Sequence, residues 1–285
     1  MWYALTDHAR YVYHYTRAET VALHILPSGQ LRFSPFRLTN DPRESKDWAL
    51  NYHARAVSLD FAEPPVRALL NKHIKHGWRV GCFSEDVYEA CETKRREDNG
   101  EDLDAAPFER GHSRPAMWWH YGDRYAGACL VFDRQQLDRD IRAAAAALGR
   151  QVHSDRVRYE VGRRIRKAPD PLMVNLDEVV RLGPVAYAKA HIDQHWRELF
   201  FVKNQDWSQE RECRWIVEGG EDEFFFVNIH RSLVGILIGD QFPKKHCAAV
   251  TAYAFAHDLN VAVMRWQNSV PQPWPAIAEL LETQY

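Results

Sequence analysis

The stretch Met117–Asp133, MWWHYGDRYAGACLVFD, opens with two tryptophans, a histidine, a tyrosine and an aspartate within seven residues. Its second half, Ala128–Phe132, is a short apolar run that is typical of a buried strand. Each of these rings carries a polar group that needs a partner when it is buried, so packing alone explains the cluster poorly. We expect the floor of a ligand pocket at the edge of a central strand. An aromatic corner of the core is the alternative, and composition alone favours it.

The composition sets limits on the class of protein. The chain has 285 residues, of which 46% are apolar, so one large domain or two small ones can form a sizeable core. Its 37 basic and 39 acidic residues nearly cancel, which excludes a global basic field for nucleic acid but leaves room for a local patch. The five cysteines, Cys82, Cys91, Cys129, Cys213 and Cys247, lack CxxC spacing and are typical of reduced, buried thiols. Without a signal peptide or a bilayer-spanning segment, we expect a cytoplasmic protein with no membrane partner.

Periodicity and turn signals predict strands and helices without regular βαβ alternation, which indicates an α+β fold. Strands are expected at about 10–15, 31–34, 79–84, 128–132, 152–161, 207–217, 224–229, 234–238 and 261–266. Helices are expected at about 16–26, 42–54, 65–76, 133–148, 175–181, 184–203, 243–257 and 274–281. The segment at about 86–115 contains the charge run TKRREDNGEDLD, so we predict one domain, 1–285, with a surface loop or insertion there. Residues 92–114 should be poorly packed.

Two local patterns predict where helices begin. Thr16 and Glu19 match a capping box, in which Thr16 accepts from the backbone and Glu19 reaches back. Asp41 and Pro42 match an N-cap followed by the first helical residue. Asn40 is not needed for that cap and is therefore free to contact a ligand.

Alternation in the predicted strand Trp207–Val217 places Glu210, Glu212 and Arg214 on one face. The two carboxylates repel each other, so one has a raised pKa unless Arg214 neutralises them. Such a pair suits general acid–base chemistry or the stabilisation of a cationic transition state. The alternative, which the sequence alone favours, is a solvated strand face with an internal salt bridge.

Two histidine pairs, His191 with His195 and His73 with His76, have spacings found at metal sites. The first pair lacks the glutamate of HExxH, and no third ligand follows at a characteristic spacing, so no metal is predicted. A metal-dependent hydrolase that uses His191 and His195 is kept as a third hypothesis. The chain has no GxGxxG, Walker or GxSxG motif, which argues against Rossmann and P-loop folds, and no cysteine lies in a recognisable nucleophile context.

Six motifs follow one another between about residues 11 and 240. They are Tyr13-His14-Tyr15-Thr16; Leu31-Arg32-Phe33-Ser34; Asn40-Asp41-Pro42-x-Glu44; Cys82-Phe83-Ser84-Glu85; Met117-Trp118-x-His120-Tyr121-Gly122-Asp123 with Gly127 and Cys129–Asp133; and Lys203-x-x-x-Trp207-x-x-Glu210-x-Glu212-x-Arg214. Together they resemble the bacterial family called domain of unknown function 2971. That family is considered similar to the ADP-ribosyltransferase fold. The resemblance implies a split, mostly antiparallel sheet with flanking helices and with NAD in the cleft between its halves.

The resemblance also implies roles for single residues. His14 matches the first-strand histidine of the histidine-tyrosine-glutamate type of transferase, which bonds the ribose and amide region of the cofactor. Glu212 matches the catalytic glutamate, and Glu210 is expected to face the acceptor. Tyr121 is the candidate ring for stacking on nicotinamide, and Ser84 has a place like the serine of the arginine-serine-glutamate type. The further cofactor-binding candidates are Tyr15, Thr16, Arg32, Ser34 and Asn40.

These residue types fit the chemistry that the resemblance implies. Breaking the nicotinamide–ribose bond of NAD develops an oxocarbenium ion, which a nearby carboxylate stabilises. A stacked ring and a histidine donor orient the leaving group. We therefore expect an NAD-dependent ADP-ribosyltransferase or NAD glycohydrolase, with a toxin or anti-phage role in view and with NAD and a protein or nucleic-acid acceptor as partners. A non-catalytic nucleotide- or nucleic-acid-binding module on the same scaffold is the second hypothesis.

Overall fold

The computed structural model describes residues 9–62, 64–86, 110–161, 170–219, 223–268 and 270–274. The strands are β1 (Tyr11–Thr16), β2 (Gln30–Pro35), β3 (Asn51–His53), β4 (Trp78–Ser84), β5 (Ala128–Asp133), β6 (Val152–Arg156), β7 (Arg158–Glu160), β8 (Met173–Asn175), β9 (Val202–Asn204), β10 (Glu212–Glu218), β11 (Phe225–Asn228), β12 (Leu233–Gly239), β13 (Asn260–Gln267) and β14 (Val270–Trp274). The α-helices are α1 (Ala18–Thr20), α2 (Leu26–Ser28), α3 (Pro42–Ser45), α4 (Pro64–Asn71), α6 (Pro115–His120), α7 (Arg134–Ala146), α8 (Leu176–Leu182), α9 (Pro184–Phe200) and α10 (Lys244–Ala256). Short 3₁₀ segments are η3 (Phe36–Leu38), η4 (Leu59–Ala62) and η7 (Gln205–Glu210), and π segments are η2 (Val21–Ile25) and η5 (Lys72–His76).

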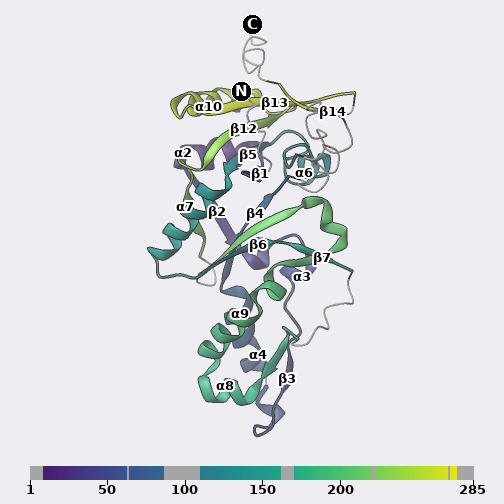
Figure 1. Ribbon diagram of the computed structural model, residues 1–285, viewed down its shortest axis with the longest axis vertical. Helices are drawn as coiled ribbons and strands as arrows, with labels where there is room; N and C mark the ends of the chain where they lie inside the picture. The colour runs from purple at the N-terminus through teal and green to yellow at the C-terminus, as the bar shows by residue number, and fades with distance from the viewer. Residues whose placement is uncertain are drawn as a thin grey trace, which may run out of the picture.

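Ten of the described strands form one open sheet (Figure 1). Its main path is β11-β2-β4-β1-β5-β12-β13-β14, and β10 with β6 branches from β4. Within the described residues of this sheet, β12 and β13 are the one parallel pair, and the other pairs are antiparallel. The predicted α+β class, with a mostly antiparallel sheet and flanking helices, is therefore confirmed.

The sheet divides between β1 and β4. Strand β1 is paired along its whole length with β5, but the described register gives it one pair with β4, Tyr13 with Ser84. Strand β4 is instead paired along its whole length with β10, beginning where Ser84 meets Glu212. Because β1 and β4 part after a single pair, side chains from both strands face a gap between the two halves of the sheet.

Three clusters of buried apolar side chains hold the layers together. The first lies between the sheet and η2, α7 and α10, and it includes Trp215 and Val250. The second lies among α4, α8 and α9, and it includes Ile216 and Phe200. The third joins one face of β1 and β5 to α6 through Trp118. Strand β10 contributes Trp215 to the first cluster and Ile216 to the second, as the alternation of side chains along a strand requires.

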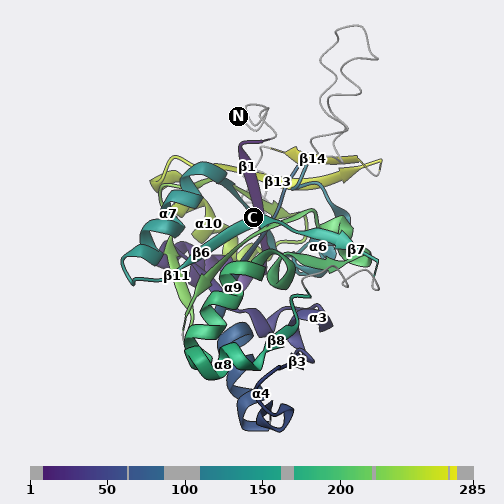
Figure 2. The same ribbon diagram turned by 60° about the horizontal axis from the view of Figure 1, so that its bottom comes forward.

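The helices at the two ends of the molecule lie far apart along its long axis. In Figure 1, α10 gathers with β12, β13 and β14 at one end, and α4, α8 and α9 gather with β3 at the other. Figure 2 shows the second group from below, with α8, α4, β3 and β8 close together. The divided part of the sheet lies between these groups.

Three predicted helix features are wrong. The helix at 42–54 ends at Ser45, because Lys46 is extended and residues 51–53 pair with β8 as strand β3. The predicted capping box at Thr16 does not form, since Thr16 still pairs with Ala128 in the sheet and Arg17 takes the N-cap position without a side-chain bond. The helix at 184–203 ends at Phe200, because Val202–Asn204 pair with β7 as strand β9. In all three places tertiary strand pairing overrides the local helix signal.

Three further expectations need correction. The predicted strand at 207–217 begins only at Glu212, because Gln205–Glu210 is a 3₁₀ turn that ends at Arg211 with a φ of 45°. Trp274 ends strand β14 rather than beginning a helix, and residues 275–281 lie outside the described ranges. Within the charged segment, residues 87–109 lie outside the described ranges, whereas residues 111–114 are buried and well packed.

None of the helices in the described ranges has both the length and the apolar character needed to cross a membrane. Four cysteines, Cys82, Cys129, Cys213 and Cys247, carry free thiols, and three of these four are buried. Cys91 lies outside the described ranges. The expectation of reduced, mostly buried thiols is confirmed for the four described cysteines.

Candidate functional site

A cavity of about 230 Å³ lies in the gap between β1 and β4. Its walls come from β1, β2 and β4, the turn after η3, the end of α6, and the β9–β10 region. Nine of the ten predicted site residues line it: His14, Tyr15, Arg32, Ser34, Asn40, Ser84, Tyr121, Glu210 and Glu212. Thr16 is not among the lining residues, because it lies at the end of β1 in the ladder with β5. These nine residues therefore converge on one cavity, and the role of each stays a prediction.

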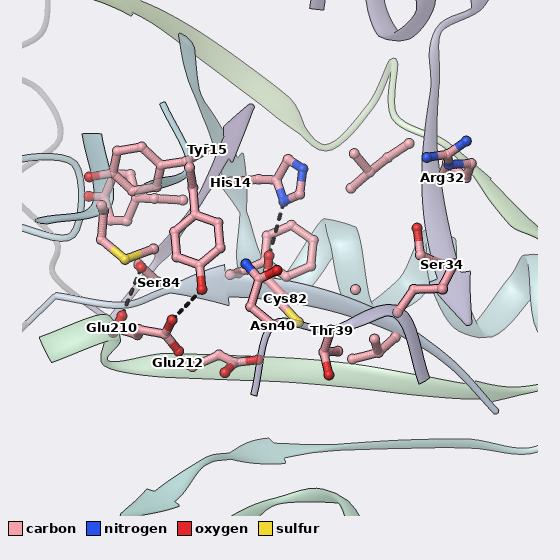
Figure 3. A pocket seen from close by; sticks show the side chains of 18 of the residues that line it. His14, Tyr15, Arg32, Ser34, Thr39, Asn40, Cys82, Ser84, Glu210 and Glu212 are labelled. Atoms are coloured by element: carbon pink, nitrogen blue, oxygen red, sulfur yellow. Dashed lines mark hydrogen bonds between the residues drawn. The ribbon is translucent and has the colours of Figure 1, made fainter. Parts of the chain in front are cut away.

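The cavity has two chemically different ends (Figure 3). Glu210 and Glu212 lie together with Ser84 at one end. Arg32 and Ser34 lie at the other end, and His14 and Asn40 lie between. The site therefore offers carboxylates at one end and a guanidinium at the other.

His14 occupies the point where the two strands part. Its Nδ1 lies 3.0 Å from the carbonyl oxygen of Cys82, a backbone acceptor of β4, and its ring lies 5.5 Å from that of Phe83. Burial lowers the pKa of His14, so the ring is neutral at pH 7. A carbonyl only accepts, so we assign the proton to Nδ1, which leaves Nε2 as an acceptor. The sequence predicted a histidine donor for the leaving group, and this tautomer instead offers an acceptor.

Glu212 is a buried carboxylate that forms a bidentate ion pair with Arg214. Arg214 Nε and Nη2 each lie 2.7 Å from one of its oxygens. The remaining guanidinium nitrogen of Arg214, Nη1, donates to Glu44 at 2.7 Å and to the carbonyl of Phe200 at 2.7 Å. Burial acts to raise the pKa of Glu212, but Arg214 and then Lys203 lower it to about 2. Since Glu212 is 4% exposed and Arg214 is fully buried, the alternative of a solvated strand face is wrong.

Lys203 joins the two carboxylates. Its Nζ lies 2.7 Å from Glu210 Oε2 and 2.8 Å from Glu212 Oε2, and its side chain is 7% exposed. Burial acts to lower the pKa of Lys203, but the charges of Glu212 and its neighbours raise it well above the ordinary value. Lys203 is therefore a cation throughout the physiological range.

Glu210 differs from Glu212 in its partners. Its Oε1 accepts from the Tyr121 hydroxyl at 2.6 Å, and its backbone carbonyl accepts from Ser84 Oγ at 2.8 Å and Arg114 Nη1 at 2.7 Å. Burial raises its pKa, and the charge of Glu212 adds to that rise although Lys203 opposes it. The sequence predicted either one raised pKa or neutralisation by Arg214. The structure has both: the pKa of Glu210 is raised, and Arg214 neutralises Glu212.

The ionisable groups in contact are not balanced. Three carboxylates, Glu44, Glu210 and Glu212, meet two cations, Lys203 and Arg214, through the ion pairs between them. With all five ionised, these ion pairs hold one more negative than positive charge, and the further cation Arg43 interacts with Glu44 from outside them. An unbalanced buried charge is costly, so either a proton on Glu210 or a positively charged ligand in the cavity would relieve it.

The aromatic stretch of α6 has two roles. Met117 and Tyr121 line the cavity, as the pocket interpretation predicts. Trp118 belongs to the core, because it is fully buried and its Nε1 donates to the carbonyl of His112 at 2.7 Å. Trp119 is 51% exposed and lies outside the cavity lining. The pocket floor and the aromatic corner are therefore both present in one short helix.

The histidine pairs lie away from this cavity. The rings of His191 and His195 are 4.7 Å apart, and His191 Nε2 lies 2.8 Å from the carbonyl of Pro171. His76 instead pairs with Asp47 at 3.0 Å. In the described ranges, no group of three or more histidine, cysteine, aspartate or glutamate residues is arranged to hold a metal ion. The hydrolase hypothesis thus finds no third ligand there.

Sequence reasoning assigned no role to Lys203, Glu44 or Cys82, although each contacts the site. Lys203 stands seven positions before Glu210 in the last of the six motifs, and that spacing was its signal. Glu44 stands in the third motif, but nothing in its local pattern pointed to Arg214, which lies 170 positions away. Long-range pairing of this kind becomes visible only in the fold.

The family model described as "Protein of unknown function (DUF2971)" matches residues 117–215. The match covers about a third of the chain and supports the resemblance to that family over the segment that contains Tyr121, Lys203, Glu210 and Glu212. Strand β1 with His14 lies outside it. No curated protein and no solved structure gives a significant match.

Proposed function

We propose that this chain breaks the nicotinamide–ribose bond of NAD and passes ADP-ribose to an acceptor or to water, as an ADP-ribosyltransferase or an NAD glycohydrolase. One observation carries the proposal. Buried carboxylates with an excess negative charge share a cavity with the neutral His14, where the sheet divides. NAD is the substrate, and the acceptor is a protein or a nucleic acid.

The charge of the site suits the charge that the reaction develops. The ribose carbon becomes positive as nicotinamide leaves. Glu210 and Glu212 are buried, so their field is screened less than it would be in water. Their positions are fixed beforehand by Lys203 and Arg214, so little reorganisation is needed in the transition state. The positive charge passes from the nicotinamide ring to the ribose carbon as the bond breaks, and there it lies beside the excess negative charge.

The two ends of the cavity suit the two ends of NAD. The nicotinamide ring is cationic and belongs beside the carboxylates, with Tyr121 as the stacking ring. The diphosphate is anionic and belongs near Arg32, whose exposed guanidinium lies 4.4 Å from the Phe224 ring. The cavity is smaller than the roughly 300–1,000 Å³ typical of ligand pockets. Only the nicotinamide and its ribose would be enclosed, and the rest would follow Arg32 to the surface.

The hydrogen bonds divide the work among the lining residues. A carboxylate accepts about four hydrogen bonds, and Arg214 with Lys203 supplies three to Glu212. The Cys82 thiol gives Glu212 a fourth, weaker hydrogen bond, and the ribose 2′-hydroxyl would take the place of that thiol. His14 Nε2 accepts from a second hydroxyl. Glu210, with its raised pKa, removes the proton of the attacking acceptor.

The same hydrogen bonds also favour the second candidate, a non-catalytic nucleotide-binding module. Glu212 is already neutralised by Arg214 and Lys203, and a fully paired carboxylate stabilises a cation less than a free one. Such a protein would bind NAD in the same cavity without cleaving it. A toxin or anti-phage role belongs to the first candidate alone, because it requires NAD to be consumed.

Nicotinamide release separates the two candidates. The purified chain is incubated with NAD labelled in the nicotinamide ring and with NAD labelled in the adenine, and free nicotinamide and labelled macromolecules are measured. Binding is measured in parallel by calorimetry. Release with transferred label supports a transferase, and release with free ADP-ribose supports a glycohydrolase. Binding without release would contradict the enzymatic proposal, and no binding would contradict both candidates.

A further inference from the structure

Lys203 contacts both carboxylates of the site but comes from a different strand. It lies on β9, a three-residue strand that pairs with β7 and places Lys203 opposite Tyr159. Its side chain is held against the ring of Trp207, with Nζ 5.5 Å from the ring centre. The Tyr159 hydroxyl in turn accepts from the backbone N–H of Glu212 at 2.8 Å. This small two-stranded sheet therefore places both side chains beside the start of β10.

The ammonium of Lys203 is the described group that contacts both carboxylates at once. Its distances of 2.7 Å to Glu210 and 2.8 Å to Glu212 limit how far apart the two oxygens lie. Arg214 contacts Glu212 but forms no described ion pair with Glu210. Without the ammonium, two neighbouring buried carboxylates would repel each other, and one would turn away or take up a proton.

Among the described residues, the other cations around the pair already have partners. The titratable or charged groups near the pair are His14 from β1, Tyr121 from the end of α6, Tyr159 from β7, Cys82 from β4, Glu44 and Arg43 from α3, Arg214 from β10, and Arg114, which bonds the Glu210 carbonyl. Arg43 donates to the carbonyls of Val202 and Glu198. Tyr121, Tyr159 and Cys82 are neutral because burial raises the pKa of each. Arg214 is divided between Glu212 and Glu44. Loss of Lys203 would therefore leave Glu210 without its charge partner.

We propose that Lys203 is a positioning residue, which keeps Glu210 and Glu212 ionised side by side so that both face the reacting ribose together. The proposal rests on the proposed function. The relative positions of the two carboxylates are then set by an ammonium from the small β7–β9 sheet, rather than by β10 itself. Glu212 is then the carboxylate that faces the developing oxocarbenium ion, and Glu210 is the one that exchanges its proton.

The test compares Lys203→Met, which keeps the stem on Trp207 but removes the charge, with Lys203→Arg. Lys75→Met is the matched control, because Lys75 is also buried but does not line the cavity. The first readout needs no activity. Carboxyl carbons of ¹³C-labelled glutamate are titrated by NMR, and Glu210→Gln and Glu212→Gln identify the two signals. The second readout is kcat and KM for nicotinamide release as a function of pH.

For Lys203→Met we expect one carboxyl of the pair to titrate about 1–3 pH units higher than in the wild type. We expect kcat to fall about 100-fold with KM for NAD nearly unchanged. The acid limb of the pH–rate profile should move to higher pH. Lys203→Arg should restore the titration and part of kcat, and Lys75→Met should change neither. An unchanged titration and an unchanged kcat in folded Lys203→Met would overturn the proposal.

The two readouts keep this proposal separate from the proposed function. If the wild type binds NAD but releases no nicotinamide, the proposed function fails, and the carboxyl titration still decides whether Lys203 controls the pair. If Lys203→Met does not fold, Lys203→Arg decides. Its guanidinium keeps the charge but changes the bridging geometry, so kcat should fall while the titration stays near that of the wild type. A wild-type kcat in Lys203→Arg together with a shifted titration would count against a positioning role.

Discussion

Tyr13 of β1 and Ser84 of β4 are register partners, and they form the one pair that joins these strands in the described register. His14 follows Tyr13, and Glu212 is the partner of Ser84 across β10. Two residues almost 200 positions apart therefore meet at one cavity because both strands are fixed by their outer neighbours, β5 and β10. A slip of one residue in either ladder would reverse the direction of every side chain in that strand.

Glu212→Gln is expected to destabilise the fold. The Glu212 side chain is buried between Arg214 and Lys203, so solvent cannot replace the lost ion pairs. Removing one partner of a buried ion pair costs about 3–5 kcal/mol in the free energy of unfolding. Guanidinium titration measures it, with Glu218→Gln at the less buried end of β10 as the control. Equal stability of the two variants would show that the pair contributes nothing.

Acid should weaken the fold through the same carboxylate. The pKa of Glu212 is about 2 in the folded chain and about 4.5 when unperturbed. The unfolded chain thus takes up a proton first, and the stabilisation from Glu212 is present above about pH 4.5 and lost as the pH falls toward 2. His14 adds to the loss below its ordinary pKa of 6.5, because its folded pKa is lowered. The free energy of unfolding should fall less steeply with acid in Glu212→Gln, and parallel curves would contradict this.

The described end of the charged segment should be protected from exchange. The Gly111 amide donates to Asp86 Oδ1 at 2.6 Å, and the Gly111 carbonyl accepts from the Tyr15 hydroxyl at 2.7 Å. Amide hydrogen exchange at Gly111 should therefore be slow, contrary to the expectation of poor packing for residues 92–114. Asp86→Ala should speed it markedly, while Asp123→Ala, at an exposed turn, should not. Fast exchange at Gly111 in the wild type would contradict the observed packing.

The sequence was sufficient to predict elements whose own pattern determines them. The strands predicted at 10–15 and 79–84 form as β1 and β4, and the helical region predicted at 16–26 ends before the left-handed Gly29. The burial of Glu210, Glu212 and Arg214 could not be predicted, because alternating charges on a strand usually face solvent. Their partners Glu44 and Lys203 come from α3 and β9, and only the fold brings them together. Strand β3 was predicted as helix for the same reason, since its partner is the distant β8.

Tyr121→Phe should separate the ring from the hydroxyl. The ring remains for stacking on nicotinamide, so NAD binding measured by calorimetry should stay close to that of the wild type. The lost bond to Glu210, 2.6 Å long, is a hydrogen bond to a carboxylate and is worth about 1.5–3 kcal/mol. Transfer should therefore slow about tenfold or more. Tyr121→Ala should weaken binding as well, and equal binding by the two variants would remove the stacking role.

The central claim is that the carboxylates of this cavity cleave NAD, and nicotinamide release tests it most directly. The matched control is Glu85→Gln, because Glu85 is buried and paired with Arg134 and Arg156 but does not line the cavity. Loss of the Glu85 charge changes the stability of the fold without changing the charge beside the substrate.

Initial rates of nicotinamide release are measured for the wild type, Glu212→Gln and Glu85→Gln, each at a temperature where circular dichroism shows it folded. We expect release by the wild type, a loss of about 100- to 1000-fold in Glu212→Gln, and near wild-type release in Glu85→Gln. A folded wild type that releases no nicotinamide, or a Glu212→Gln variant as active as the wild type, would contradict the claim.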